Sequence, residues 1–136
     1  MNLELYGFSS AAVNKNYVET VFQLSGKTWE TIKTNQIKNK GKNIWVYGKN
    51  NEVFAGVELK EPVSGNPDLE KKIINLPKYA FYRHVGPYNL IKNAGQNMTL
   101  SLQNSGEKII EPYIEIYGHW TNDESKLETD LIMALA

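Results

Sequence analysis

The sequence predicts an α+β fold in which two pseudo-twofold-related strand–helix–strand–strand modules form a curved antiparallel sheet with a central groove and two main helices. Ile-Trp-Val-Tyr-Gly at residues 44–48 is followed 70 residues later by Ile-Glu-Ile-Tyr-Gly at residues 114–118. The same offset relates two helical stretches, so the register of the repeat extends beyond one strand. A duplicated unit folded about an axis leaves a cleft along that axis. We therefore look for function where the copies differ, as Trp45 and Glu115 do.

The chain of 136 residues predicts one domain, 1–136, which would bury roughly two thirds of its unfolded surface without disulfides or metals. Within it we expect internal repeats at 1–60 and 71–136 and a linker at 61–70. The linker is predicted because it contains the turn formers Pro62, Gly65, Asn66 and Pro67.

Charge and composition exclude several classes of partner. Fifteen basic and fifteen acidic residues give no net charge, and Arg83 is the single arginine. Since phosphate contacts draw on clustered Lys and Arg, we expect no direct nucleic-acid partner. No apolar run approaches the roughly 20 residues of a membrane span, so we expect no membrane segment. The chain has no cysteine and its N-terminus does not resemble a signal peptide, which makes a cytoplasmic location the expectation.

The first module is predicted as strand, helix and hairpin. Residues 3–13 are apolar enough for a strand, and residues 17–34 follow as an amphipathic helix. Residues 43–47 and 52–60 flank the turn-rich Gly-Lys-Asn-Asn and are expected to pair as a hairpin. The stripe that predicts the helix, at three- and four-residue spacing, consists of Val18, Val21, Phe22, Ser25, Trp29 and Ile32.

The second module repeats that order. Residues 73–85 are predicted as one strand, and Gly-Pro at 86–87 suits the start of a helix because proline lacks an amide hydrogen that the first turn cannot use. Ser-Gly at 105–106 is the expected helix end. Residues 112–118 and 127–134 are the predicted last strands. The apolar stripe of this helix is Ile91, Ala94, Met98 and Leu102.

The most informative strand is Tyr-Ile-Glu-Ile-Tyr at residues 113–117. Side chains alternate across a strand, so Glu115 shares one face with both tyrosines and the isoleucines take the other. We expect the isoleucine face to pack under the helices. The acidic and aromatic face would then line the cleft, where the pseudo-twofold axis brings Trp45 and Tyr47.

This constellation predicts a site for a small molecule that is hydrophobic and cationic. A carboxylate among aromatic rings costs several kcal/mol to desolvate unless a positive group lies beside it, and the chain offers few cations there. Aromatic faces attract cations by roughly 0.5 to 2 kcal/mol each. Glu115 would act as counter-charge, and the spacing of Trp29 fits core packing as well as a wall. The candidate walls are Trp29, Trp45, Tyr47, Tyr82, Tyr113 and Tyr117.

No pattern in the sequence predicts a metal or a cofactor. His84 and His119 are far apart and no metal-ligand spacing surrounds either of them. Gly-Lys-Thr at 26–28 lacks the earlier glycine of a phosphate-binding loop, and the chain has no Gly-x-Ser-x-Gly elbow. We expect neither a metal site nor a bound cofactor.

Two segments resemble a known family. Leu-Pro-Lys-Tyr-Ala-Phe-Tyr-Arg-His-Val-Gly-Pro-Tyr at 76–88 and Glu-Pro-Tyr-Ile-Glu-Ile-Tyr at 111–117 are similar to segments of the GyrI-like small-molecule-binding family, which is also met as the effector-binding domain of AraC-type and MerR-type bacterial regulators. The resemblance implies paired strand–helix–strand–strand modules around a groove whose glutamate is Glu115. It implies binding of hydrophobic, often cationic, small molecules, as in multidrug binding. DNA-binding relatives carry a separate domain for DNA, so this chain resembles the stand-alone members.

Three functions stay open at this point. The first is a ligand-binding module that serves as a transcription effector or as a drug-sensing or sequestering protein. The second is a small-molecule hydrolase in which Glu115 is the general base and Tyr82 or Tyr117 donates a proton. The third is a protein-interaction module, such as a gyrase inhibitor, that contacts a protein partner through exposed strands or helices.

Overall fold

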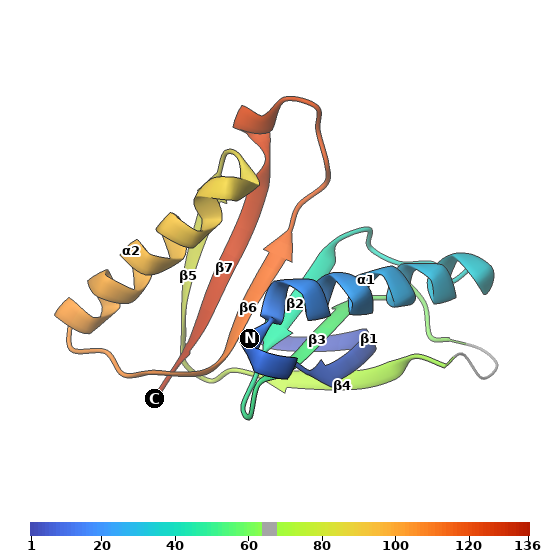
Figure 1. The fold of residues 1–136 in the computed structure, drawn as a ribbon, viewed down its shortest axis with the longest axis horizontal. Helices are drawn as coiled ribbons and strands as arrows, with labels where there is room; N and C mark the ends of the chain where they lie inside the picture. Colours follow the sequence, from blue (N-terminus) through green and yellow to red (C-terminus); the bar gives the residue numbers. More distant parts are fainter. Residues whose placement is uncertain (64–67) are drawn as a thin grey trace.

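The computed structural model describes residues 1–63 and 68–136. These residues form one antiparallel sheet in the order β4-β1-β3-β2-β6-β7-β5, accompanied by helices α1 (Tyr17–Thr34) and α2 (Ile91–Asn104) (Figure 1). The strands are β1 (Asn2–Ala11), β2 (Asn43–Tyr47), β3 (Glu52–Val57), β4 (Glu70–Asn75), β5 (Tyr79–Val85), β6 (Ile109–Tyr117) and β7 (Glu128–Leu135). The predicted α+β class is therefore confirmed.

The sheet is symmetric about its central pair of strands, β2 and β6. Their register places Trp45 opposite Glu115 and Tyr47 opposite Tyr113. Outward from this pair the order is β3 then β1 on one side, and β7 then β5 on the other. Each half thus contains a strand, a helix and a hairpin in that order, with β4 added beyond β1. We call β1, α1, β2 and β3 the first half and β5, α2, β6 and β7 the second half.

Both helices occupy their predicted positions. α1 has the predicted bounds, and its buried residues are Val21, Ser25, Thr28 and Ile32. Val18 and Phe22 of the predicted stripe are largely exposed to solvent. α2 follows a short 3-10 turn at Tyr88–Leu90 and ends before Gly106, whose φ of 78° is the left-handed conformation that terminates helices. No described helix is both long and apolar enough to cross a membrane.

The prediction of a single strand over residues 73–85 is wrong. The segment forms β4, which pairs with β1, and β5, which pairs with β7 at the opposite edge of the sheet. Leu-Pro-Lys at 76–78 separates them, because proline cannot donate to a ladder and restricts the residue before it. Leu76 is buried, and its amide donates to the carbonyl of Met1 at 2.8 Å.

The remaining strand ends differ from the prediction by a few residues. β3 ends at Val57, earlier than predicted, and β6 begins at Ile109, before a register shift between Ile110 and Tyr113. Residues 64–67 of the predicted linker lie outside the described residues. Glu70, the last residue of that linker, is the first residue of β4. The division into repeats and linker stays a prediction.

Ile114 and Ile116 of β6 do not pack under the helices, contrary to our expectation. Ile114 is fully buried in a cluster drawn from strands of both halves, from β4 and from Leu76 after it. The cluster contains no residue of either helix. Leu131 and Met133, which lie opposite Glu115 and Tyr113, pack instead against Ile91 and Met98 of α2. The curved sheet encloses its own core on the face away from the helices. Both helices therefore flank the face that carries Glu115.

Candidate ligand-binding site

Glu115 lies at the middle of the helix-covered face of the sheet. Residues directly opposite each other in antiparallel strands point to the same face. Trp45 lies opposite Glu115 across β2 and β6, and Leu131 lies opposite Glu115 across β6 and β7. Ala55 of β3 continues the row beyond Trp45. The carboxylate thus lies where the two halves meet, as the repeat predicted.

The Glu115 side chain is buried and is held by three phenol groups. Tyr113 donates its hydroxyl to Oε2 at 2.8 Å, and Tyr117 donates to Oε1 at 2.8 Å. Tyr47 makes a longer contact to Oε1 at 3.4 Å. The residue is 8% exposed, and within residues 1–63 and 68–136 it forms no ion pair. Neutral donors solvate the carboxylate without cancelling its charge.

The three phenols remain donors over a wide pH range. Burial is the main cause that raises the pKa of Tyr47, Tyr113 and Tyr117 well above the usual tyrosine value, and the charge of Glu115 adds to it. A phenolate beside a buried carboxylate would place two like charges in a poorly hydrated site. The hydroxyls therefore keep their protons and keep Glu115 in place.

An aromatic groove of about 1510 Å³ opens above Glu115. Trp45 packs against Tyr117 with ring centroids 4.6 Å apart, and Tyr47 stacks on Tyr113 at 5.8 Å. The edge of Phe22 on α1 meets Trp45 at 5.2 Å, and Tyr88 meets Tyr117 at 5.6 Å. The rings of both halves thus form a nearly continuous wall around the carboxylate.

Charges in the groove are few and differ in burial. Lys92 of α2 is the basic side chain among the described lining residues, and it is exposed to solvent, whereas Glu115 is buried. The indole nitrogen of Trp45 is also buried and has no hydrogen-bond partner among the described residues. The inner part of the groove is therefore apolar and anionic.

Five of the seven predicted site residues line this groove. They are Trp45, Tyr47, Tyr113, Glu115 and Tyr117.

The other two predicted site residues, Trp29 and Tyr82, are not among the residues that line the groove in the described part of the chain. The Trp29 indole donates to the side chain of Asn43, which joins α1 to β2. The Trp29 side chain is part-buried and belongs to neither hydrophobic cluster, so core packing of this residue stays a prediction. Tyr82 lies on the outer strand β5, is 48% exposed, and is separated from Glu115 by Leu131 of β7.

Several lining residues were missed as site residues by sequence reasoning. Phe22 was assigned to the packing stripe of α1, and Tyr88 was considered only as part of the passage into α2. Gly95 also lines the groove, and a Cβ placed on it would lie 3.8 Å from the Tyr113 hydroxyl oxygen. The available signal was the offset of 70, which aligns Gly95 of α2 with the buried Ser25 of α1 and so marks a position where the halves differ.

Comparison with solved structures supports the fold. The C-terminal domain of EcmrR matches with a TM-score of 0.71 and 14% identity over 99% of this chain and 92% of that one. The SAV2435 protein bound to tetraphenylphosphonium matches with a TM-score of 0.64 and 13% identity over 99% and 89%. A putative transcription regulation protein from Staphylococcus aureus MU50 matches with a TM-score of 0.69 and 12% identity over 98% and 92%. At these identities the likeness shows the fold alone.

No curated protein matches the sequence. The family model described as the GyrI-like small molecule binding domain matches residues 16–136. That range includes both helices and all the strands after β1, with the groove and its glutamate. The chain therefore belongs to the GyrI-like small-molecule-binding family, as its two sequence segments predicted.

Proposed function

We propose that the groove binds a hydrophobic, cationic small molecule and that Glu115 is its counter-charge. The observation that carries this proposal is a buried carboxylate held by tyrosine hydroxyls, with no ion pair among the described residues, at the floor of an aromatic groove. Desolvating an anion is costly unless a positive charge joins it. A ligand cation would supply that charge.

The aromatic wall gives such a cation a second source of binding energy. A cation within about 6 Å of an aromatic centroid gains about 0.5 to 2 kcal/mol from the ring quadrupole. Trp45, Tyr47, Tyr113 and Tyr117 surround the carboxylate. Small-molecule pockets commonly measure about 300 to 1,000 Å³, so a groove of about 1510 Å³ has room for a bulky, multi-ring ligand.

The comparisons support this choice of ligand class without identifying the ligand. One structural neighbour was solved with tetraphenylphosphonium, a cation surrounded by four phenyl rings. Another is EcmrR in a complex with DNA, and this chain covers 55% of that longer chain. We propose that the present chain supplies the ligand-sensing or ligand-sequestering part of such a system, with the protein partner as the alternative outcome.

The hydrolase alternative has less support from the geometry. Glu115 already accepts hydrogen bonds from three phenols, which occupy lone pairs that a general base needs for water. Tyr82, one of the two proposed acids, is not among the described lining residues. A structural neighbour from Listeria innocua is described as a hydrolase. Recovery of a bound ligand chemically unchanged after long incubation would count against hydrolysis by this chain.

Thermal unfolding with tetraphenylphosphonium tests the proposal. At a hundredfold excess over its dissociation constant, the cation should stabilise the wild-type protein by about 2.7 kcal/mol. Glu115→Gln should lose most of that stabilisation, whereas Glu111→Gln, an exposed glutamate of the same strand, should retain it. Equal stabilisation of all three proteins, or none in the wild type with this or any other lipophilic cation, would refute the proposal.

A further inference from the structure

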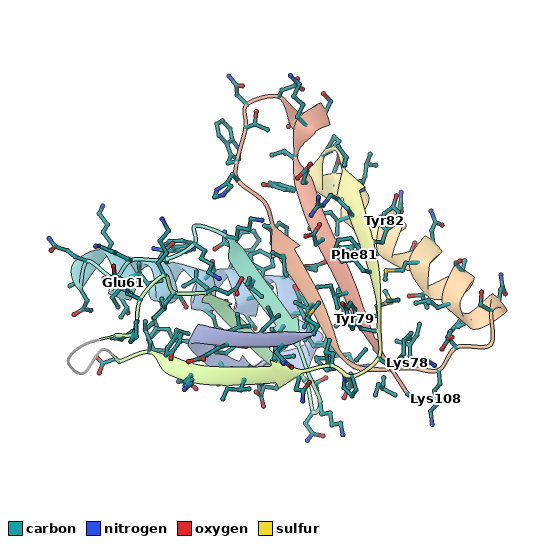
Figure 2. All side chains as sticks on the ribbon, turned by 180° about the vertical axis from the view of Figure 1, so that it is seen from behind. Glu61, Lys78, Tyr79, Phe81, Tyr82 and Lys108 are labelled. Atoms are coloured by element: carbon teal, nitrogen blue, oxygen red, sulfur yellow. The ribbon has the colours of Figure 1, made fainter. Side chains whose placement is uncertain are left out.

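The two edges of the sheet differ in chemistry. β4, the edge beyond β1, carries Glu70, Lys71 and Lys72, which are charges of the kind that discourage strand pairing between molecules. β5, the other edge, contains no lysine, and its exposed residues include Phe81 at 52% and Val85 at 56%. Figure 2 shows the labelled side chains of β5 along this outer strand. The β5 edge is therefore less protected against pairing than the β4 edge, since its one such charge, Arg83, is paired with Asp130.

The outward hydrogen-bonding groups of β5 follow from its ladder with β7. The carbonyl of Lys78 accepts from the Leu135 amide, and the Gly86 amide donates to the Leu127 carbonyl, so the even-numbered residues of β5 bond to β7. Backbone groups of alternate residues point to opposite edges of a strand. The free groups therefore belong to Tyr79, Phe81, Arg83 and Val85.

We propose that a second copy of this chain pairs with β5, antiparallel and edge to edge, so that two sheets join into one. The register that uses every outward group places Tyr82 opposite the partner's Tyr82 on a twofold axis. Phe81 then lies opposite the partner's Arg83, and Tyr79 lies opposite the partner's Val85. Neighbouring registers leave outward amides or carbonyls without partners, which is costly when they are buried.

The side chains of β5 are self-complementary in this register. Within one chain the Arg83 guanidinium already lies 5.8 Å from the Phe81 ring centroid, and the same pairing of a cation with a ring would recur across the axis. Arg83 is also paired with Asp130 at 2.7 Å. Lys78, just before β5, is paired with Glu107 at 2.9 Å. Arg83 of β5 and Lys78 just before it are therefore already paired within each copy when the two strands approach each other.

This surface is separate from the ligand groove. None of Tyr79, Phe81, Arg83 and Val85 is among the described lining residues. Leu131 of β7 lies between β5 and Glu115. The proposed dimer therefore does not depend on the proposed ligand binding. Glu115→Gln should dimerise as the wild type does.

The first experiment measures molar mass against concentration by analytical ultracentrifugation. The wild type should approach twice the chain mass of 15.5 kDa as concentration rises, and Phe81→Lys should stay a monomer over the same range. Ile73→Lys is the matched control, because Ile73 is an apolar residue 69% exposed on the other edge strand, and it should dimerise as the wild type does. A monomeric wild type at millimolar concentration, or equal dimerisation of Phe81→Lys, would overturn the proposal.

A second experiment tests the register and does not depend on the stability of the charged variant. The chain has no cysteine, so a single introduced thiol reports only its own contacts. Tyr82→Cys places two thiols opposite each other on the axis at a separation that a disulfide can span. Mild oxidation should crosslink Tyr82→Cys into a dimer and leave Ile73→Cys largely uncrosslinked. Preferential crosslinking of Ile73→Cys, or capture of a different protein instead of a second copy, would refute the self-pairing.

Discussion

The two halves of the molecule share one strand order but hold their helices differently. In the first half, Thr28 of α1 donates its hydroxyl to the carbonyl of Ala55 at 2.8 Å, so the helix lies close to the sheet. In the second half, α2 rests on the side chains of Leu131 and Met133. Ala55 and Leu131 occupy corresponding places in the row, beside Trp45 and Glu115 respectively. Figure 1 shows each helix beside the strands of its own half.

The difference explains where the groove lies. Ala55 is a small residue under α1 and allows that helix to pack closely on the sheet. Leu131 is a larger residue under α2, so α2 packs on side chains instead. α2 accordingly supplies most of the helical residues that line the groove, while α1 supplies Val18 and Phe22. Two halves with one strand order can thus differ in how closely their helices pack on the sheet, and most of the helical groove lining comes from the half that packs less closely.

The largest expected effect comes from removing the support of α2. Leu131→Ala deletes a fully buried side chain that packs against Ile91 and Met98. We expect it to lower the free energy of unfolding by about 2 to 5 kcal/mol, measured by urea denaturation. Leu100→Ala, on an exposed position of the same helix, should stay within about 0.5 kcal/mol of the wild type. Equal effects at the two positions would mean that α2 does not rest on Leu131.

The reciprocal change should disturb the closed half. Ala55→Leu inserts a large side chain beneath α1, where Ala55 is fully buried and its carbonyl accepts from Thr28. We expect a loss of about 1 to 3 kcal/mol in the same denaturation measurement, because overpacking forces the helix away from the sheet. A neutral effect would show that α1 has room to spare, and the contrast between the halves would be lost.

A pair of glycine substitutions separates stability from binding. Gly26 lies on α1 with nothing within 4 Å of an added Cβ, and Gly95 lies on the groove side of α2. Each change to alanine should raise the free energy of unfolding by about 0.5 to 1 kcal/mol, because helical glycine is entropically costly. Tetraphenylphosphonium binding, measured by calorimetry, should change only for Gly95→Ala. A change in binding for Gly26→Ala alone would contradict the assignment of Gly95, and not Gly26, to the groove.

The smallest expected effect is the change in the free energy of unfolding at alkaline pH, which the groove tyrosines cause. Unfolded tyrosine loses its proton near pH 10, whereas burial raises the pKa of Tyr113 and Tyr117 in the folded protein. Above about pH 10 the folded state therefore binds more protons, and the free energy of unfolding falls as the pH rises. Tyr117→Phe should reduce this slope in melting experiments between pH 9 and 11. An unchanged slope in that variant would contradict the buried environment of the hydroxyl.

The sequence predicted most of the arrangement that depends on periodicity. The stripe of α1 and the repeat at offset 70 led to the helix bounds and to Trp45 opposite Glu115. Alternation shows which side chains share a face, but it does not show which face the helices cover, so the isoleucine face was assigned to the wrong side. The break between β4 and β5 was missed because Leu-Pro-Lys is short and lies between two strand-forming runs.

Aromatic residues were harder to place than the carboxylate. Trp29 and Phe22 lie on the same helix at similar spacing, yet Phe22 lines the groove and Trp29 bonds to Asn43. Helical periodicity places Phe22 and Trp29 on one side of α1, but it does not show whether other side chains, solvent or a ligand groove lies beside each ring. Glu115 was identifiable because it stands where the repeat places Trp45 in the first half, and because a carboxylate that shares a face with aromatic residues needs a specific partner.

The central claim is that the charge of Glu115 selects the ligand, and two molecules of nearly equal shape and opposite charge test it most directly. Calorimetry should show that the wild type binds tetraphenylphosphonium at least tenfold more tightly than tetraphenylborate, a difference of about 1.4 kcal/mol or more. Glu115→Gln should lose that preference through weaker binding of the cation, with its fold intact by circular dichroism. Equal affinity of the wild type for both ions, or an unchanged preference in Glu115→Gln, would contradict the account.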